Sequence, residues 1–450
     1  MKMVKSLLLG SAAGLVAIAG AQAADLPVKA KPVQYVKICS LYGAGFYYIP
    51  GTDTCLKVGG MVRAEVGFNA GGSFSPMFAD HDSRGYDVQH WRTRAALTLD
   101  ARSQTAYGTL RSFAYMSATD DYSGANTGGN TGSNNGTGAS GYIRLYAPAA
   151  FIQWAGFTVG KTSSMFDFDG MGYSNQSNFW GSANGGNGIE IWAYTAQFGN
   201  GLSGTVSAEN NVGRRVGVAT SAGVAEGVSG ETMPDIVGNL RIDQAWGSAQ
   251  VMAAAHQVNF SNAADPKDKT GWAAGAGLKF NLPMLGHGDN VSGQFTYAKG
   301  AMDYVSSGMG QANTTVMGGT SSFSPGFDAV VTAAGAADLT SGWSIVGGYE
   351  HHWNPNWKTS LYGAYGEVNY TTAASAALAA QAAVVAAGVT AGSSADWNYL
   401  QVGSRTVWTP VHNLDLSVEV MYNNQGTGFA GTNIGNNDWV SGIFRVQRNF

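Results

Sequence analysis

The chain has 450 residues, 64 of them glycine; 12% are charged, and the formal net charge is −4. This mildly acidic balance excludes nucleic acid as the expected partner, and the charged share is about half that of an ordinary soluble domain. Many aromatic residues, few charges and much glycine favour a β-barrel with polar loops and aromatic girdles, although a secreted β-solenoid has a similar composition.

Residues 1–23 have the pattern of a secretory signal peptide. Two lysines precede an apolar run from Leu7 to Ala19, and the small-residue motif at 21–23 (AQA) follows directly. The alternative is a transmembrane anchor, but the run is short and weakly apolar. We therefore expect cleavage after Ala23 and export of the mature chain.

The next segment, residues 24–55, holds both cysteines of the chain, Cys39 and Cys55. Beyond a signal peptide the compartment is oxidising, which favours a disulfide between them. Closing this short loop contributes about 3 kcal/mol in the chain-entropy model. The alternative is a pair of free buried thiols, and a zinc site lacks nearby histidines.

Residues 56–450 alternate between extended segments of about ten to fourteen residues and connections that are short and long in turn. The segments show a two-residue apolar–polar period, which is typical of strands with one apolar face. We predict an all-β fold, a transmembrane antiparallel β-barrel of about 16 strands with long external loops and an aqueous lumen. The clearest strands are Leu56–Phe68, Gln89–Arg102, Trp272–Phe280, Trp343–Tyr349 and Leu414–Tyr422.

Tight turns are predicted where turn-forming residues separate two extended runs. They include Ser103–Gln104, Gly199–Gly201 and Asn354–Asn356. The longer connections, rich in Gly, Asn, Ser and Thr, are predicted as loops. The predicted loops are Asn69–Tyr86, Asp120–Ser140, Asp169–Gly188, Asn211–Met233, Met302–Thr340 and Thr371–Asp396.

Arginines in the early strands fall on the polar side of the alternation. Arg63, Arg92 and Arg94 all oppose the apolar residues of their strands. An arginine on the lipid face at the bilayer midplane costs about 2–4 kcal/mol. The placement therefore favours a wet interior over a soluble β-sandwich with ordinary surface charge.

An alanine-rich stretch, Ala373–Ala391, is the nearest approach to an apolar helix in the mature chain. It has little Leu, Ile or Phe, and Gln381 interrupts it, so it is a weak transmembrane candidate. We interpret it as a helical or disordered surface loop.

The last segment, Asp438–Phe450, is predicted to be the closing strand. Val440, Phe444, Val446 and Phe450 share one side of the alternation. In lipid a sheet leaves no backbone unpaired, so the last strand must pair with the first. Phe450 is accordingly assigned to barrel closure.

Several segments resemble the porins of alphaproteobacterial outer membranes, the general-diffusion family that includes Brucella and Rhizobium porins. The similar residues are Cys39–Gly60 (CSLYGAGFYYIPGTDTCLKVGG) with Arg63, Trp154–Ser164 (WAGFTVGKTSS) and the final Phe450. The resemblance covers the whole chain, but the loops match no fixed pattern. It implies a 16-stranded homotrimeric barrel in which the third external loop folds into the lumen and narrows it.

The resemblance places the third long loop after the fifth strand, here about Gly156–Phe166, and the loop at Asp167–Gly188. Two acids, Asp167 and Asp169, open this loop. Acids facing arginines create a transverse field that orients dipolar solutes. The predicted constriction consists of Arg63, Arg92, Arg94, Arg111, Arg144, Asp167 and Asp169. The alternative for each is ordinary lumen or loop polarity.

Signals for catalysis, a metal or a cofactor are absent from the sequence. Gly160–Thr162 lacks the earlier glycine of a phosphate-binding loop, and no nucleophile elbow or zinc-protease motif occurs. His351 and His352 are adjacent strand residues that point to opposite faces. Tryptophans near strand ends are interpreted as interface anchors, with a sugar-stacking track as the alternative.

We therefore expect an outer-membrane channel, not an enzyme, that conducts small hydrophilic solutes and ions by passive diffusion. Its expected partners are outer-membrane lipid, lipopolysaccharide and two further copies of the chain. The alternatives are a channel selective for sugars or anions, a receptor or adhesin barrel with a plugged lumen, and an outer-membrane hydrolase.

Overall fold

The computed structural model describes residues 37–69, 88–122, 143–168, 172–176, 188–220, 225–226, 230, 232–260, 266–306, 309, 313–317, 320–385, 389, 393–431 and 434–450. The predicted signal peptide, residues 1–23, lies outside the described residues. So do most of the loops predicted at Asn69–Tyr86 and Asp120–Ser140.

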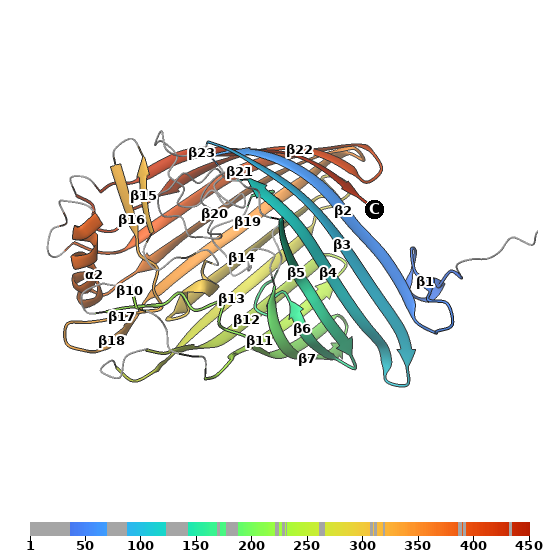
Figure 1. The fold of residues 1–450 in the computed structure, drawn as a ribbon, viewed down its shortest axis with the longest axis horizontal. Helices are drawn as coiled ribbons and strands as arrows, with labels where there is room; N and C mark the ends of the chain where they lie inside the picture. Colours follow the sequence, from blue (N-terminus) through green and yellow to red (C-terminus); the bar gives the residue numbers. More distant parts are fainter. Residues whose placement is uncertain are drawn as a thin grey trace, which may run out of the picture.

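One large sheet dominates the described residues and closes into a barrel (Figure 1). It has 17 strands, of which the two-residue β1 (Tyr47–Tyr48) is an appendage. The other sixteen are β2 (Cys55–Phe68), β3 (Gln89–Thr105), β4 (Gly108–Tyr122), β5 (Ile143–Trp154), β6 (Phe157–Thr162), β7 (Ile189–Gly199), β8 (Leu202–Glu209), β11 (Asp235–Gln244), β12 (Gly247–Val258), β13 (Lys269–Asn281), β14 (Asn290–Lys299), β19 (Ser341–Asn354), β20 (Trp357–Asn369), β21 (Trp397–Val411), β22 (Leu414–Gln425) and β23 (Asn437–Asn449). The predicted antiparallel barrel is confirmed.

The sheet closes because β2 pairs with both β3 and β23. At this seam Met61–Phe68 pairs with Gly442–Asn449 in antiparallel register. Phe450 extends the ladder, since its N–H donates to the Gly60 carbonyl and its own carbonyl accepts from the Gly60 N–H, both at 3.0 Å. No strand of the cylinder therefore keeps an open edge at the seam, as lipid requires.

Side chains alternate across the wall as the sequence predicts. On β2, Val58 and Val62 are 42% and 51% exposed, whereas Arg63 and Glu65 are buried toward the inside. On β22, Val418 is exposed and Glu419 is buried. A two-residue period with apolar side chains outward is the arrangement that places a barrel in lipid with a polar lumen.

The connections separate into two ends of the barrel, a turn end and a loop end. Two predicted boundaries at these ends are wrong. The turn predicted at Ser103–Gln104 lies instead at 106–107, since both residues still pair with β4 and the left-handed backbone is supplied by Gly108, with φ of 100°. The fifth barrel strand, expected to reach Phe166, ends at Thr162.

A small disulfide-bonded hairpin lies at the turn end, where Figure 1 shows β1 beside the base of β2. The predicted bridge between Cys39 and Cys55 is present, and both residues are almost completely buried. Phe46 packs against the bridge, and the Arg102 guanidinium carbon of β3 lies 5.0 Å from its ring. The hairpin is thereby fixed to the barrel wall.

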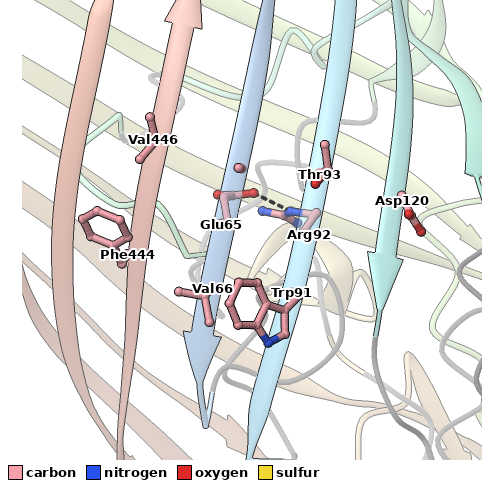
Figure 2. Close-up of a pocket in the computed structure, with 9 residues that line it drawn as sticks. Glu65, Val66, Trp91, Arg92, Thr93, Asp120, Phe444 and Val446 are labelled. Carbon is pink, nitrogen blue, oxygen red and sulfur yellow. Dashed lines mark hydrogen bonds and ion pairs between the residues drawn. The ribbon is translucent and has the colours of Figure 1, made fainter.

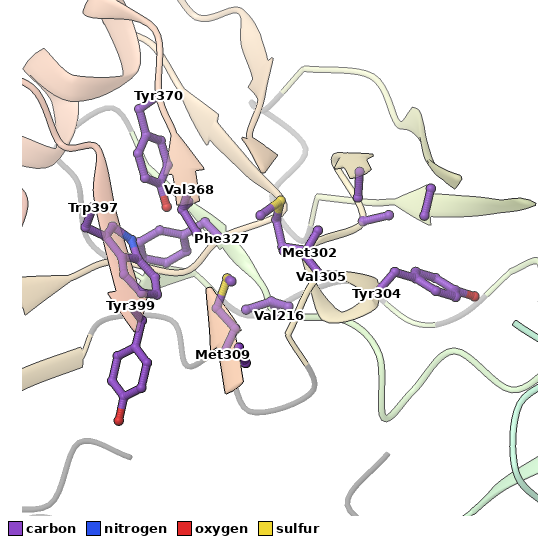
Figure 3. Packing of buried hydrophobic residues seen from close by; sticks show 14 of the residues in the cluster. Val216, Met302, Tyr304, Val305, Met309, Phe327, Val368, Tyr370, Trp397 and Tyr399 are labelled. Carbon is purple, nitrogen blue, oxygen red and sulfur yellow. The ribbon is translucent and has the colours of Figure 1, made fainter. Parts of the chain in front are cut away.

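The loop end carries further structure, whose apolar side chains pack into a large cluster (Figure 3) and a smaller one. We call this material the cap. Its elements are β9 (Val218–Ala219), β10 (Ala225–Glu226), η3 (Met302–Tyr304), β15 (Asn313–Met317), β16 (Thr320–Ser324), β17 (Ala329–Val331), β18 (Ala337–Leu339) and α2 (Thr372–Val385). The buried side chains of the larger cluster include Phe327, Tyr370 and, from β21, Trp397.

Residues 373–385 of the alanine-rich stretch lie in α2, which confirms the helical alternative for this part, and most of 386–391 lies outside the described residues. It is not a plain surface segment, because Ala374, Ala377 and Leu378 are buried in the cap cluster. None of the helices in the described ranges is long and apolar enough to cross a bilayer.

Polar groups attach the cap to the barrel wall. His256 Nδ1 lies 2.8 Å from Asp235 on the neighbouring strand, and the Tyr304 hydroxyl donates to Asp235 at 2.7 Å. Asp328 accepts the N–H groups of Val216 and Met302. Buried polar groups that are satisfied in this way hold one arrangement of their elements.

Asp289, in the turn between β13 and β14, organises the turn end. It accepts hydrogen bonds from the Tyr349 hydroxyl at 2.7 Å and the His352 N–H at 2.8 Å, and its Oδ2 lies 2.7 Å from His351 Nδ1. Although burial opposes ionisation, these partners lower the pKa of Asp289 to about 2.

We predict that Asp289→Asn lowers the thermal unfolding midpoint by about 3 °C or more at pH 7, because hydrogen bonds to a charged acceptor are lost. A lowered carboxyl pKa stabilises the fold above the ordinary value near 4, and this contribution disappears as the pH falls toward 2. The difference from wild type, followed by circular dichroism, should therefore narrow at pH 2–3. An equal difference at both pH values contradicts this account.

Candidate functional site

Register places several inward charges in one row across four adjacent strands. Arg445 of β23 pairs with Glu65 of β2, which pairs with Arg92 of β3. On the other side Arg445 pairs with Ser417 of β22. Since side chains at paired positions of a sheet share a face, this row forms a continuous polar stripe inside the barrel.

Glu65 is the centre of this stripe. Arg92 Nε donates to Glu65 Oε2 at 2.5 Å, and Arg445 Nε donates to Oε1 at 2.5 Å. Arg63 Nε lies 3.6 Å from the same carboxylate. Figure 2 shows the Glu65–Arg92 pair bridging β2 and β3. One carboxylate thus lies beside three arginines, so the group carries a net positive charge.

A second row adds to that excess. Arg63 pairs in register with Arg94, and Arg94 pairs with Thr119. Arg94 donates to the Thr119 hydroxyl at 2.8 Å and lies 5.7 Å from the Tyr146 ring centre, so its partners are neutral. Among the described residues Arg63 Nε has no hydrogen-bond partner. We call Arg63, Arg92, Arg94, Arg445 and Glu65 the arginine cluster.

The third long connection crosses the inside of the barrel, as expected. The Phe168 N–H donates to Gln294 of β14, and the Tyr173 hydroxyl donates to Asn290 and Ser292 of the same strand at 2.6 and 2.9 Å. The next residues reach the far wall. We call residues 172–176 the loop tip.

The loop tip is held by Glu419 of β22. This carboxylate accepts from the Ser174 hydroxyl at 2.7 Å and from the Asn175 N–H at 2.5 Å, and it also accepts from Tyr362 at 2.5 Å. Because Glu419 is 1% exposed, its charge is compensated by these donors and not by water.

Arginines of the closing strands complete the attachment. Arg445 donates to the Asn175 side-chain oxygen at 2.7 Å and to its carbonyl at 3.0 Å. Arg405 of β21 donates to the Gly172 carbonyl at 2.6 Å and pairs with Glu350 at 3.2 Å. Since Arg445 also pairs with Glu65, the loop tip and the arginine cluster are parts of one network.

The predicted constriction residues are only partly brought together. Arg63, Arg92 and Arg94 meet in the arginine cluster. Arg144 lies in register with Thr119 of the second row, but its side chain lies outside the described residues. Arg111 is at another level near the turn end, where it bonds to Asp100 at 3.0 Å.

Of the two predicted acids, only Asp167 lies within the described residues. Asp167 lies 4.0 Å from Arg214, a buried residue of the connection after β8. Burial opposes the charge of Arg214, but nearby Tyr304, Asp167 and Asp303 raise its pKa overall. Asp169 lies outside the described residues.

The sequence analysis missed Glu65, Arg405, Glu419 and Arg445 as site residues. All but Arg405 showed a signal, because Glu65, Glu419 and Arg445 fall on the polar side of strands with clear alternation. Loop residues such as Ser174 and Asn175 showed no sequence signal of this kind. Polar loop residues are common, and their contacts depend on the tertiary structure. Among the described residues no group of His, Cys, Asp and Glu is arranged to hold a metal ion.

Comparisons with known proteins agree on one family. A family model described as "Porin subfamily" matches residues 25–443. Porin Omp2b of Brucella canis is 36% identical over 259 residues, which cover 57% of this chain and 66%, just under two thirds, of that porin. Porin Omp2b of Brucella suis is 34% identical over 267 residues, covering 57% of this chain and 67% of that porin.

A solved structure shares the fold. The outer membrane channel DcaP of Acinetobacter baumannii aligns with a TM-score of 0.60 over 90% of this chain and 99% of that one. Its sequence is 17% identical, so the likeness concerns the architecture of the barrel.

We predict that Glu419→Gln loosens the loop tip. Each hydrogen bond to a charged group contributes about 1.5–3 kcal/mol, and the variant weakens those from Ser174 and Asn175. Single-channel conductance should become higher and noisier than in wild type. The control is Glu367→Gln on β20, because Glu367 accepts from Trp343 and Tyr365 and makes no hydrogen bond to residues 172–176. Identical traces for both variants would show that Glu419 does not hold the loop tip.

Proposed function

The chain belongs to the porin family whose model spans residues 25–443, and from that premise we propose that it forms a water-filled channel for passive diffusion of small hydrophilic solutes and ions. The protein is a β-barrel of the bacterial outer membrane. The family points to a channel and not to an enzyme.

The observation that carries the proposal is the loop tip beside the arginine cluster. A segment that crosses the lumen and is held on the far wall reduces the cross-section for solutes. The remaining surface is polar and carries fixed charges on rigid strands, which orders water and penalises apolar solutes. A size limit and a charge bias then arise at the same level of the barrel.

The bias we propose is toward anions. The arginine cluster contains four arginines and one carboxylate. Of the two loop acids expected to balance it, Asp167 lies beside Arg214 instead. A positive excess at a constriction concentrates anions locally and repels cations.

We further propose that the barrel contacts membrane lipid and lipopolysaccharide and assembles as a homotrimer. A pocket of about 230 Å³ lies at the seam among side chains of β2, β3 and β23. Figure 2 shows Val66, Trp91 and Phe444 at this pocket, and Trp91 and Phe444 are exposed on the outer surface. Such a recess beside the small Ala64 accommodates a side chain of a neighbouring copy.

We predict that Arg63→Gln together with Arg94→Gln shifts the ion selectivity toward cations. The reversal potential under a KCl gradient in planar bilayers should move toward the potassium potential, since two positive charges leave the narrow region. The control is Arg448→Gln on β23, an exposed arginine that donates to the His412 carbonyl at the turn end. If the double variant kept the wild-type reversal potential, the arginine cluster would not determine ion selectivity.

We predict that Ala64→Trp, which fills the seam pocket, converts trimers to monomers on native gels while the barrel keeps its heat-modifiable migration. The control is Val251→Trp, at an exposed position of β12, a strand that contributes no residue to the pocket. Intact trimers in the Ala64 variant would place the subunit contact elsewhere.

A further inference from the structure

The inner side of β4 and β5 is aromatic where a barrel lumen is ordinarily polar. Phe113 and Tyr115 share the inward side of β4 with Arg111, and Phe151 and Tyr146 lie opposite on β5. We call these four rings the aromatic strip. All four are half-buried, and none belongs to the buried apolar clusters of the described residues.

The strip has a defined geometry. Phe113 and Phe151 are register partners whose ring centres are 5.2 Å apart with an interplanar angle of 27°. The Arg111 guanidinium carbon lies 5.0 Å from the Phe113 ring centre and 5.3 Å from that of Phe151. Hydrogen bonds to Asp100 and Gln153 hold Arg111 in this position.

An arginine stands at each end of the strip. Arg111 marks the end nearer the turns, and Arg94, over the Tyr146 ring, marks the other. Arg111 and Thr119, the partner of Arg94, are eight residues apart on β4, which is roughly 26 Å along a strand. Apolar rings therefore connect the arginine cluster to a second cationic position.

Half-exposed phenylalanines in an aqueous lumen cost free energy unless something covers them. A small inorganic anion needs the arginines but not the rings. A neutral sugar could stack on the rings but does not use the charges. A planar aromatic ring with a carboxylate uses both, since rings stack on rings and carboxylates pair with guanidinium groups.

We propose that the aromatic strip is a binding track for aromatic monocarboxylates of the benzoate class. The ring of the solute stacks on Phe113 and Phe151, and its carboxylate pairs first with the arginines of one end and then with those of the other. The inference rests on the proposed channel function and adds a preferred solute class to it.

The test uses the full protein in planar bilayers in KCl, with benzoate and cyclohexanecarboxylate as probes of equal charge and similar size. Benzoate should halve the chloride current at a concentration about three- to ten-fold lower than cyclohexanecarboxylate does, which is the advantage expected from aromatic stacking. In Phe113→Leu/Phe151→Leu, which keeps the surface apolar, this advantage should disappear while the conductance in KCl alone stays. Val58→Leu on the outer face is the matched control.

Equal block by the two acids in wild type overturns the proposal, because charge alone then explains it. Block by glucose at the same concentrations also overturns it, in favour of a sugar track. A barrel without conductance refutes the channel function separately. Saturation-transfer NMR of benzoate on the detergent-solubilised protein then decides the track: contact that is lost in the double Leu variant supports it, and unchanged contact overturns it.

Discussion

The structure depends on one requirement of the bilayer, that every backbone N–H and C=O in hydrocarbon finds a partner within the protein. The sheet meets this requirement by pairing β2 with β23 along Met61–Phe68. Once the sheet is closed, the strand period places alternate side chains in lipid and in the lumen. Lumen chemistry follows from this division, because Arg63 and Glu65 are directed inward by the same pleat that directs Val62 outward.

The loop tip is specified by charge in the wall and not by its own conformation. Its small residues Gly172, Ser174 and Asn175 are fixed by charged side chains of β21, β22 and β23, which follow more than two hundred residues later. Rigid strands position the charged partners, and the loop adapts to them. The position of the loop tip thus depends on the wall as much as on the loop itself.

The barrel, its strand number and the inward arginines could be predicted from the sequence because they rest on a local two-residue period. Arg92 and Arg94 needed only the alternation of their own strand. The third loop was expected inside only through the family resemblance, since its contacts span 244 residues between Asn175 and Glu419. The contact of Asp167 with Arg214 could not be predicted either, because Arg214 lies in a connection with no recognisable pattern.

Strand boundaries were less predictable where ladder pairing continues through polar residues. Ser103 and Gln104 look like turn residues, yet they pair with Leu110 and Thr109. The folded cap had no signal beyond an alanine-rich stretch, since its cluster joins Tyr304 and Phe327, from the connection between β14 and β19, to Trp397 of β21. Long-range packing of this kind is not encoded in any short window of the sequence.

The contact between Glu65 and Arg445 joins residues 380 positions apart in the chain. It lies at the seam between the first and last strands of the barrel. Bringing such distant partners together carries a large entropic penalty, so long-range pairing forms late during folding. The contact between Glu65 and Arg445 and the closed seam therefore form in the same step of folding. A barrel with an open seam would lack both a continuous wall and the contact between Glu65 and Arg445. Pairing of β2 with β23 supplies the two together.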